Sequence, residues 1–589
     1  MADYLTTSAV DSLVKSYQSA QYSRRVYPLE VRQQKFSTLS SGWGDLKTKL
    51  TALKTTASDF KTATDSSLFF TRSVSVSNES VLTATASSNS PQSSYTMRVN
   101  QLAKSDLIVS ETQASDTAVT TMAGTHTIQI GSGNYTSNVD VELTGTETNE
   151  TIMEKLSLAI NADKAVSLSD SFDPTAVFTG TGSFTIDIND VVGTDTAETI
   201  SYDYGTTSKT YSEVMDDLVS NINTNVNGVL AEKIIDDITG FVSLQLTVED
   251  SDDSITIGGT STFLNMDVIN EKGASGLANA SLFSPATDQS KFSITSKESG
   301  YDNRLIMSDV SGSIFNQIGL TSALLTGRTI SADDTSAGFI YSSTSSTDNA
   351  LNAKVAFNGI NIQRNSNVIT DLVDSVTFNL SAVNKVEDPD VSISVKVDTE
   401  SITADIKEFI TNFNNTYTYI KNNSYSSGDK DNRGAFVGDS TARSLMSTLT
   451  NLAMGQVSGL QTGNLSYLSE IGISFSPATG LSISDSSKLE TSLEENASQV
   501  ADLFSSTNGI ANTLYDTLDN YLGVDGSISN LIKSYDSNVT YYNTKIETIN
   551  KSIDKTADIL RGQYESLQMQ LLTLTYSYNS MNALSSGGY

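Results

Sequence analysis

Apolar side chains recur at coiled-coil spacing at both ends of this 589-residue chain, and no other feature constrains the fold as strongly. Between Phe36 and Phe60 the steps alternate between three and four, and between Ile546 and Met581 the side chains recur every seven residues. Such a stripe lies on one face of a helix that needs another helix beside it. We therefore expect the first and last helices to pack on each other, although heptads also line ordinary helical bundles. The predicted seam is Phe36, Leu39, Trp43, Leu46, Leu50, Leu53, Ile546, Ile553, Leu560, Leu567, Leu574 and Met581.

The first helix should cover residues 8–61, with a bend or interruption near Pro28 and a looser stretch from Ser40 to Gly44. After residue 397 helical spacing returns. Asp398 or Thr399 is a plausible cap for the helix that follows. Further segments are predicted as a helix at 440–454, a hairpin at 471–484 and a helix at 488–504.

Between the helical ends the hydrophobic period falls to two, which is typical of half-exposed antiparallel strands. The predicted strands lie within 98–104, 125–131, 183–189, 242–250, 354–362, 375–382 and 391–397. A weak internal repeat is also present: the strand at 125–130 precedes a helix at 150–161, and the strand at 183–188 precedes a helix at 212–223. Both helices end in Ile-Asn, which indicates two related modules.

These patterns predict an α+β multidomain fold in which the chain goes out through a helical stalk and returns to it. The N- and C-terminal helices would form a coiled-coil leg, and antiparallel β head domains would be inserted into a helix-rich stalk domain. The expected boundaries are 1–40 with 540–589 for the leg, 41–72 with 399–539 for the stalk, 73–112 with 286–398 for the β head, and 113–285 for an outer head of one domain or of two modules, 113–170 and 171–285.

The charge of the chain argues against nucleic acid or an anionic membrane as its main partner, because the net charge is −32. Residues 140–260 hold 23 acidic and 4 basic residues, so the middle of the chain is expected to face water. There is no cysteine, no secretory signal at the start, and no apolar run of the roughly 20 residues that cross a bilayer. If the chain is exported, we expect this to occur without a cleaved signal peptide.

No motif in the sequence points to catalysis, a cofactor or a metal. The single histidine, His126, lies in an alternating run and is predicted to be a strand residue. Asp429 and Asp431 resemble the start of a calcium loop, but Arg433 falls at a ligand position and Ser440 replaces the closing glutamate. The run GSGNYT at 131–136 lacks the third glycine of a dinucleotide fingerprint, and the acidic run at 249–254 is interpreted as a charged loop. We expect a protein that is not an enzyme.

Several segments resemble the FliD family of flagellar filament cap proteins, also called flagellar hook-associated protein 2. The opening AVDSLVKSYQSAQYSRRVYPLEVRQQKFSTLSSGWGDLKTKLTAL is similar to the N-terminal region of that family, and SYTMRVNQLAKSD (94–106) resembles its Tyr-x-x-x-Val-x-Gln-Leu-Ala signature. GAFVGDSTARSLMSTL, LSEIGISFSPATGLSI and LRGQYESLQMQL are similar to its C-terminal domain in order and spacing. The resemblance covers about the first 110 residues and roughly the last 240.

The resemblance implies an annular homo-oligomer, most often a pentamer, at the distal end of a bacterial flagellar filament. It implies that the ring retains exported flagellin and promotes its folding and insertion. It also implies contact with hook-filament junction proteins, a cytoplasmic export chaperone and passage through the flagellar type III channel. Two alternatives are a flagellin-like or hook-junction filament subunit and an extracellular adhesin.

Overall fold

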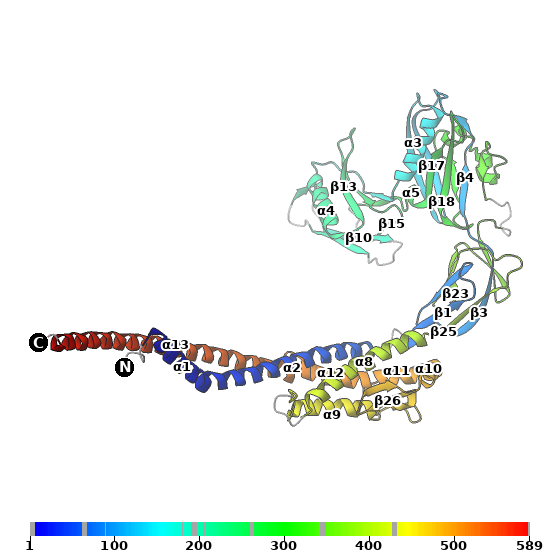
Figure 1. Ribbon diagram of the computed structural model, residues 1–589. Helices are drawn as coiled ribbons and strands as arrows, with labels where there is room; N and C mark the ends of the chain where they lie inside the picture. The colour runs from blue at the N-terminus through cyan, green and yellow to red at the C-terminus, as the bar shows by residue number, and fades with distance from the viewer. Residues whose placement is uncertain are drawn as a thin grey trace. The chain divides into compact units, whose positions relative to one another are not determined.

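The computed structural model describes residues 6–61, 68–88, 90–178, 181–189, 197–203, 208–258, 264–341, 349–426 and 433–586 (Figure 1). The chain divides into two compact units. The stalk unit comprises Met1–Ser73, Ala86–Gln92 and Val395–Tyr589, and the head unit comprises Val74–Thr85 and Ser93–Ser394. The stalk unit is mainly helical and the head unit is rich in antiparallel strands, so the predicted α+β class is confirmed.

The N-terminal helix is irregular just before Pro28 and regular after it. Helix α1 (Thr7–Gln21) leads through a π-helical turn (Tyr22–Val26) into α2 (Tyr27–Asp59). Proline lacks an N–H, and its ring crowds the carbonyl four residues earlier, which accounts for the wider turn at this point. The expected loosening between Ser40 and Gly44 is wrong, because α2 continues through both positions.

Gly42 lies within that helix at a point where the returning chain comes close. A Cβ added there would lie 3.2 Å from the Cβ of Ala435, and the Tyr419 hydroxyl donates a hydrogen bond to the Gly42 carbonyl at 3.2 Å. The neighbouring Trp43 ring packs on Phe436, with their centroids 4.6 Å apart. The glycine therefore serves a close approach between α2 and the returning chain rather than a break in the helix.

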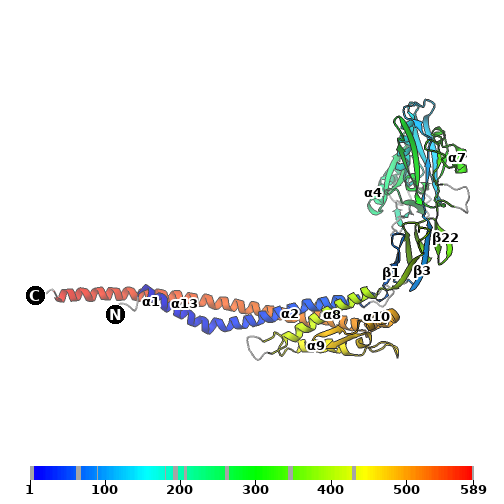
Figure 2. The same cartoon turned by 45° about the vertical axis from the view of Figure 1, so that its right-hand side comes forward.

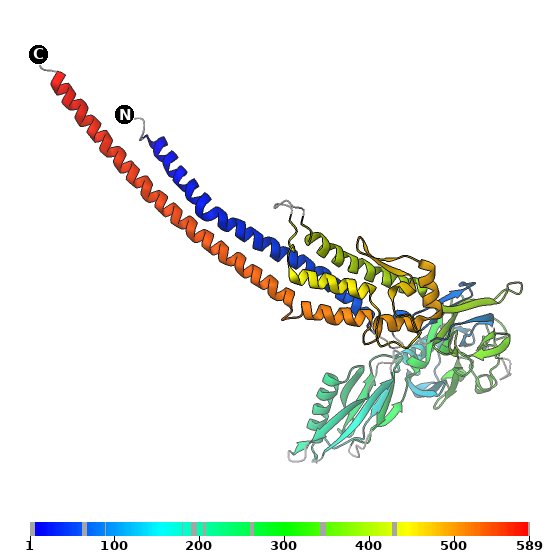
Figure 3. The same ribbon diagram turned by 90° about the horizontal axis from the view of Figure 1, so that it is seen from below.

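The returning chain supplies the remaining helices of the stalk unit, which Figure 3 shows from below. Asp398 is the cap of the first of them, because its Oδ1 accepts a hydrogen bond from Ser401 N at 3.0 Å. The predicted helix at 488–504 is in fact two helices, which meet at the non-helical Asn496. The elements are α8 (Thr399–Asn423), α9 (Ser440–Met454), β26 (Ile473–Ser476), β27 (Gly480–Ile483), α10 (Ser486–Glu495), α11 (Ala497–Ser505), α12 (Ile510–Leu522) and α13 (Ser527–Ser586).

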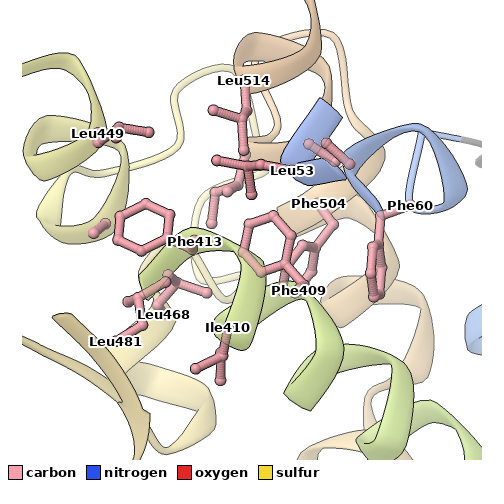
Figure 4. Packing of buried hydrophobic residues seen from close by; sticks show 14 of the residues in the cluster. Leu53, Phe60, Phe409, Ile410, Phe413, Leu449, Leu468, Leu481, Phe504 and Leu514 are labelled. Atoms are coloured by element: carbon pink, nitrogen blue, oxygen red, sulfur yellow. The ribbon is translucent and has the colours of Figure 1, made fainter. Parts of the chain in front are cut away.

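One hydrophobic core joins α2 to these returning helices. Phe60 at the end of α2 stacks on Phe504 of α11, with centroids 5.3 Å apart, and meets Phe409 of α8 edge to face at 5.8 Å (Figure 4). Leu53 and Leu514 are buried in the same cluster. The stalk unit is thus held together by residues that lie more than 300 positions apart in the sequence.

The base of the head unit consists of two antiparallel sheets (Figure 2). The first has the order β1 (Arg72–Val76), β25 (Val391–Val397), β3 (Ser93–Gln101), β21 (Ala353–Phe357) and β22 (Ile360–Arg364). Strand β3 lies between β25 and β21, so an outgoing strand is flanked by two strands of the returning chain. The second sheet has the order β2 (Leu82–Ala86), β24 (Val376–Leu380) and β23 (Val368–Val373).

The predicted strand at 354–362 is instead a hairpin of β21 and β22. Asn358 and Gly359 form its turn, with φ values of 48° and 81°. Two successive residues with positive φ are the signature of the tight turn that Asn-Gly favours, and the alternating side chains on either side concealed it.

Beyond this base lie two further groups of strands and helices, each with its own hydrophobic core. The inner module comprises β4 (Ser105–Val109), β6 (Ala123–Ser132), β7 (Tyr135–Thr144), α3 (Asn149–Ala162), β17 (Ala278–Phe283), β18 (Gln289–Ser299), β19 (Ile306–Asp309) and β20 (Gly338–Phe339). The outer module comprises β8 (Val166–Leu168), β10 (Thr181–Asn189), β11 (Glu198–Asp203), α4 (Tyr211–Asn225), β13 (Val229–Ile235), β14 (Val242–Val248), β15 (Ser254–Gly258) and β16 (Asp267–Asn270).

Candidate assembly surface along the terminal helices

The terminal helices α2 and α13 lie side by side in both Figure 1 and Figure 3. Phe36 of α2 packs between two tyrosines of α13, with ring centroids 6.1 Å from Tyr535 and 5.8 Å from Tyr542. The Ser40 hydroxyl donates a hydrogen bond to an Asp536 carboxylate oxygen at 2.5 Å. The first predicted seam residue therefore does meet the last helix, as its heptad position indicates.

A second contact joins α1 to the middle of α13. Val10, Val14 and Ala557 are buried together, with Tyr17 and Tyr564 packed against them. At its edge Arg561 forms an ion pair with Asp11, and Gln18 Nε2 donates to Asp554 Oδ1 at 3.1 Å. The Gln18 hydrogen bond is exposed and the ion pair is only partly buried, so the small apolar cluster contributes more than the charges to holding these helices together.

The predicted seam residues fall into three groups according to their burial. Trp43, Leu46, Leu50 and Leu53 are fully buried in the stalk core, and Ile553 is buried on α13. Phe36, Leu39, Ile546 and Leu560 are half-buried. Leu567, Leu574 and Met581 are exposed to 44, 70 and 68%. The structure thus places four seam residues of α2 in the stalk core and leaves the last three of α13 exposed, rather than joining all twelve in one seam.

The exposed end of α13 keeps the coiled-coil spacing. Leu567, Leu571, Leu574, Tyr578 and Met581 follow one another at steps of four, three, four and three, and all five are exposed. At 3.6 residues per turn they lie on a single face of the helix. An apolar stripe of this length on the surface is typical of a site that another molecule covers. We call these five residues the open stripe.

Lysines reinforce the side of α2 that faces α12. Lys54 Nζ lies 2.5 Å from an Asp519 carboxylate oxygen and 4.5 Å from the centroid of the Tyr515 ring. Lys61 Nζ lies 3.7 Å from the same centroid. The hydrogen bond to Asp519 raises the pKa of Lys54, which keeps that side chain charged at neutral pH. These contacts fasten the helices and leave no acid or base poised for chemistry.

Tyr419 is the most perturbed phenol of the stalk unit. Burial and the nearby Asp45 carboxylate, 3.2 Å from its oxygen, raise the pKa of Tyr419 to about 12. A phenol held in this way is a hydrogen-bond donor at physiological pH rather than a base. Its role here is to join α8 to α2.

His126 and the glycine-rich run, which lie within the described residues, occupy structural positions in the head unit. His126 is buried on β6 against Gly312, whose added Cβ would lie 1.9 Å from the His126 Nδ1. Gly133 and Asn134 connect β6 to β7, so the glycine-rich run is a hairpin turn. Asp429 and Asp431 lie outside the described residues. Within the described ranges no group of three or more His, Cys, Asp or Glu side chains could hold a metal ion, and no helix is long and apolar enough to span a membrane.

Two contacting residues on α13 were missed by the sequence analysis. Tyr535 and Tyr542 are the aromatic partners of Phe36. Tyr535 lies seven residues before Tyr542, and this interval was the available signal, because it continues the heptad register of α13 towards its start.

Two family models match this chain. The model described as flagellar hook-associated protein 2 N-terminus covers residues 6–106, and the model described as flagellar hook-associated protein 2 C-terminus covers residues 350–575. The chain belongs to the flagellar hook-associated protein 2 family. The two matches include the helices that form the candidate assembly surface up to residue 575 and the returning strands of the head base.

Curated relatives of the family agree with this assignment. The A-type flagellar hook-associated protein 2 of Pseudomonas aeruginosa is 23% identical over 310 residues, which are 51% of this chain and 62% of the relative. The flagellar hook-associated protein 2 of Salmonella typhimurium is 27% identical over 255 residues, 40% of this chain and 53% of the relative. That of Thermotoga maritima is 24% identical over 549 residues, 86% of this chain and 82% of the relative. The chain spans about half to three fifths of the length of the first two.

Solved structures of the same family are also similar. The crystal structure of the flagellar cap protein FliD D1-D2-D3 domains from Escherichia coli aligns with a TM-score of 0.44 and 19% identity, over 84% of this chain and 99% of that chain.

Proposed function

We propose that this chain caps the distal end of a bacterial flagellar filament as a homo-oligomeric ring. Family membership supports the assignment, and the feature of the structure that carries it is the open stripe on α13. The apolar face of α13 contacts α2 and α1 and then continues as the exposed open stripe, which suits a leg that is covered by neighbouring subunits or by filament subunits. In this proposal the chain retains exported flagellin at the tip and promotes its folding and insertion.

The proposal extends to the other partners of such a cap. The homo-oligomer would be a closed ring, with five subunits as the expected number, and would act without enzymatic activity. Export would run through the flagellar type III channel without a cleaved signal peptide, after binding a cytoplasmic chaperone. Hook-filament junction proteins would precede it in assembly. The final location is extracellular, at the filament tip.

The test replaces two residues of the open stripe with charges. Leu574→Asp with Met581→Asp should leave the fold intact, because both side chains are already exposed, and should prevent stable capping, because each aspartate must then be desolvated against an apolar partner. The control is Thr573→Asp with Ser580→Asp, which places equal charge at the preceding residues, roughly 100° around the helix from the open stripe.

The measurement is swimming in soft agar, beside immunoblotting of flagellin in the culture supernatant. Swimming should be lost and monomeric flagellin should accumulate in the medium for the stripe variant only. Normal swimming of the stripe variant contradicts the proposal. Electron microscopy of the purified wild-type protein adds a second criterion, since closed rings favour a cap and open helical fibres favour a filament subunit.

A further inference from the structure

The inner and outer modules of the head unit share seven strands and one helix in the same order. In the inner module the hairpin β6–β7 is followed by helix α3 and then by β17, β18 and β19. In the outer module the hairpin β10–β11 is followed by helix α4 and then by β13, β14 and β15. Each module also begins with a short strand, β4 or β8, and ends with another, β20 or β16.

The strands pair identically in the two modules. One sheet has the order β19-β6-β7 in the inner module and β15-β10-β11 in the outer module. The other has the order β17-β18-β4-β20 in the inner module and β13-β14-β8-β16 in the outer module. Every one of these neighbouring pairs is antiparallel. Element order and pairing therefore correspond over seven strands and one helix.

A side-chain contact at the end of each helix repeats as well. Asn161 of α3 donates to the Ala280 carbonyl at 2.8 Å and accepts from Ala280 N at 2.9 Å. Asn223 of α4 donates to the Ala231 carbonyl at 2.9 Å and accepts from Ala231 N at 2.7 Å. Ala280 and Ala231 lie on β17 and β13, which are the edge strands of equivalent sheets. Each amide thus replaces a missing neighbouring strand at one residue of the edge.

A second contact repeats at the end of β4 and of β8. Ser110 exchanges hydrogen bonds with Phe292, whose N–H donates to the Ser110 hydroxyl at 2.9 Å, and that hydroxyl donates to the carbonyl of the next residue at 2.8 Å. Ser169 does the same with Leu244, at 2.8 Å for both side-chain contacts. Two independent local contacts at equivalent positions favour duplication over chance similarity of fold.

The outer module lies within the sequence of the inner module, between α3 and β17, and its two connections run together. Ser275 N donates to the Asp163 carbonyl at 3.1 Å, and Ala274 N donates to Asp163 Oδ2 at 2.7 Å. A Cβ added to Gly273 would lie 2.3 Å from the Asp163 carbonyl oxygen. Because entry and exit meet at one point, the inner module needs nothing from residues 164–273 to close its own chain.

The hydrophobic cores of the two modules are separate, and polar contacts join the modules. Lys297 of β18 forms an ion pair with Asp252, and Asn138 N donates to Asn270 Oδ1 at 3.3 Å. Exposed ion pairs and single hydrogen bonds contribute little stability, whereas separate apolar cores make separate folding units.

We propose that residues 164–273 are a complete second copy of the inner module, inserted into it as a unit, and that they form a self-contained accessory head. The junction of Asp163 with Ala274 is then a permissive site, at which this head accepts an entire folded domain without loss of its own fold. The proposal concerns the head unit alone and holds whether or not the chain caps a filament.

The test removes residues 164–273 from the full chain and joins Asp163 to Ala274 through two glycines. The inner module should remain folded, so the backbone amides of Ala280, Phe292 and Ile294 should keep their protection in hydrogen exchange measured by mass spectrometry. The matched control removes residues 150–259, which is the same length of chain but deletes most of α3 and leaves the outer module incomplete. That control should lose protection at the same amides.

The proposal is overturned if both deletions lose protection equally and the intact chain shows a single transition for the two modules. The intact chain is examined by hydrogen exchange in rising denaturant, which does not depend on any variant folding. Separate loss of protection in residues 105–162 and in residues 208–258 supports two folding units. A single transition shared by both regions refutes the existence of two folding units, whatever the deletions show.

Discussion

Glu147 is a buried acidic residue of the head unit. Its carboxylate accepts hydrogen bonds from Lys155 Nζ at 2.7 Å and from the backbone N–H groups of Thr144, Gly145 and Thr146. These donors, Lys155 first, hold the pKa of Glu147 well below its usual range. The residue closes the loop between β7 and α3, where an acceptor is needed for three otherwise unpaired donors.

Glu147→Gln should lower the stability of the head unit at neutral pH. Because the folded-state pKa is depressed, the stabilising contribution is complete above the unfolded value of 4.5 and disappears as pH falls towards the folded value. The difference in unfolding temperature between wild type and variant should therefore narrow below about pH 4.5. Thermal unfolding followed by circular dichroism from pH 7 to pH 3 measures it. Glu154→Gln, an exposed change of equal charge on α3, is the control, and a difference that does not depend on pH would contradict the assignment.

At the scale of the element, the same heptad pattern has two different outcomes. Leu50 on α2 is fully buried, and Leu574 on α13 is 70% exposed, although both occupy seam positions. Heptad spacing predicts which face of a helix is apolar. It does not predict which segment covers that face, since this depends on where the other segments end. The apolar face of α13 simply continues beyond the residues of α1 that cover its middle.

Leu50→Ala should therefore destabilise the stalk unit by about 2–5 kcal/mol, the usual range for a fully buried leucine. Leu574→Ala should change the stability of the free chain by no more than about 0.5 kcal/mol, because the side chain is already in water. Chemical denaturation monitored by the fluorescence of Trp43 compares them. Equal losses for the two variants would mean that the open stripe is covered within a single chain.

Local signals in the sequence predicted most elements, and the two missed breaks share a physical cause. The break at Asn496 and the turn at Asn358 and Gly359 interrupt runs whose periodicity continues across them. Periodicity averages over a window of residues, whereas a break depends on the backbone of one or two. The seam on α2 was predicted well because its residues enter a core, and the aromatic partners on α13 were missed because the heptads were read from Ile546 onward.

At the scale of the whole molecule, the nested order of the head hides its repeat. The sequence shows the strand and helix that open each module, but the strands that complete the inner module follow only after the outer one has ended. Two related segments can be recognised in sequence, whereas their pairing requires the sheets. The same holds for the base of the head, where β3 pairs with a strand about 250 residues later.

The nesting of the head within the stalk also sets an order of events in folding. The two halves of the stalk core are separated by the entire head, and closing so long an unstructured loop is costly in entropy. Once β1 and β25 are neighbours in their sheet, that loop is replaced by a folded body and the cost falls. The head should thus fold first, and its folding should bring α2 close to α8. Trp43, the single tryptophan, lies in the stalk core and reports its closure. In stopped-flow refolding its fluorescence change should lag behind the far-ultraviolet signal of the strands, and a fluorescence change that leads that signal would exclude this order.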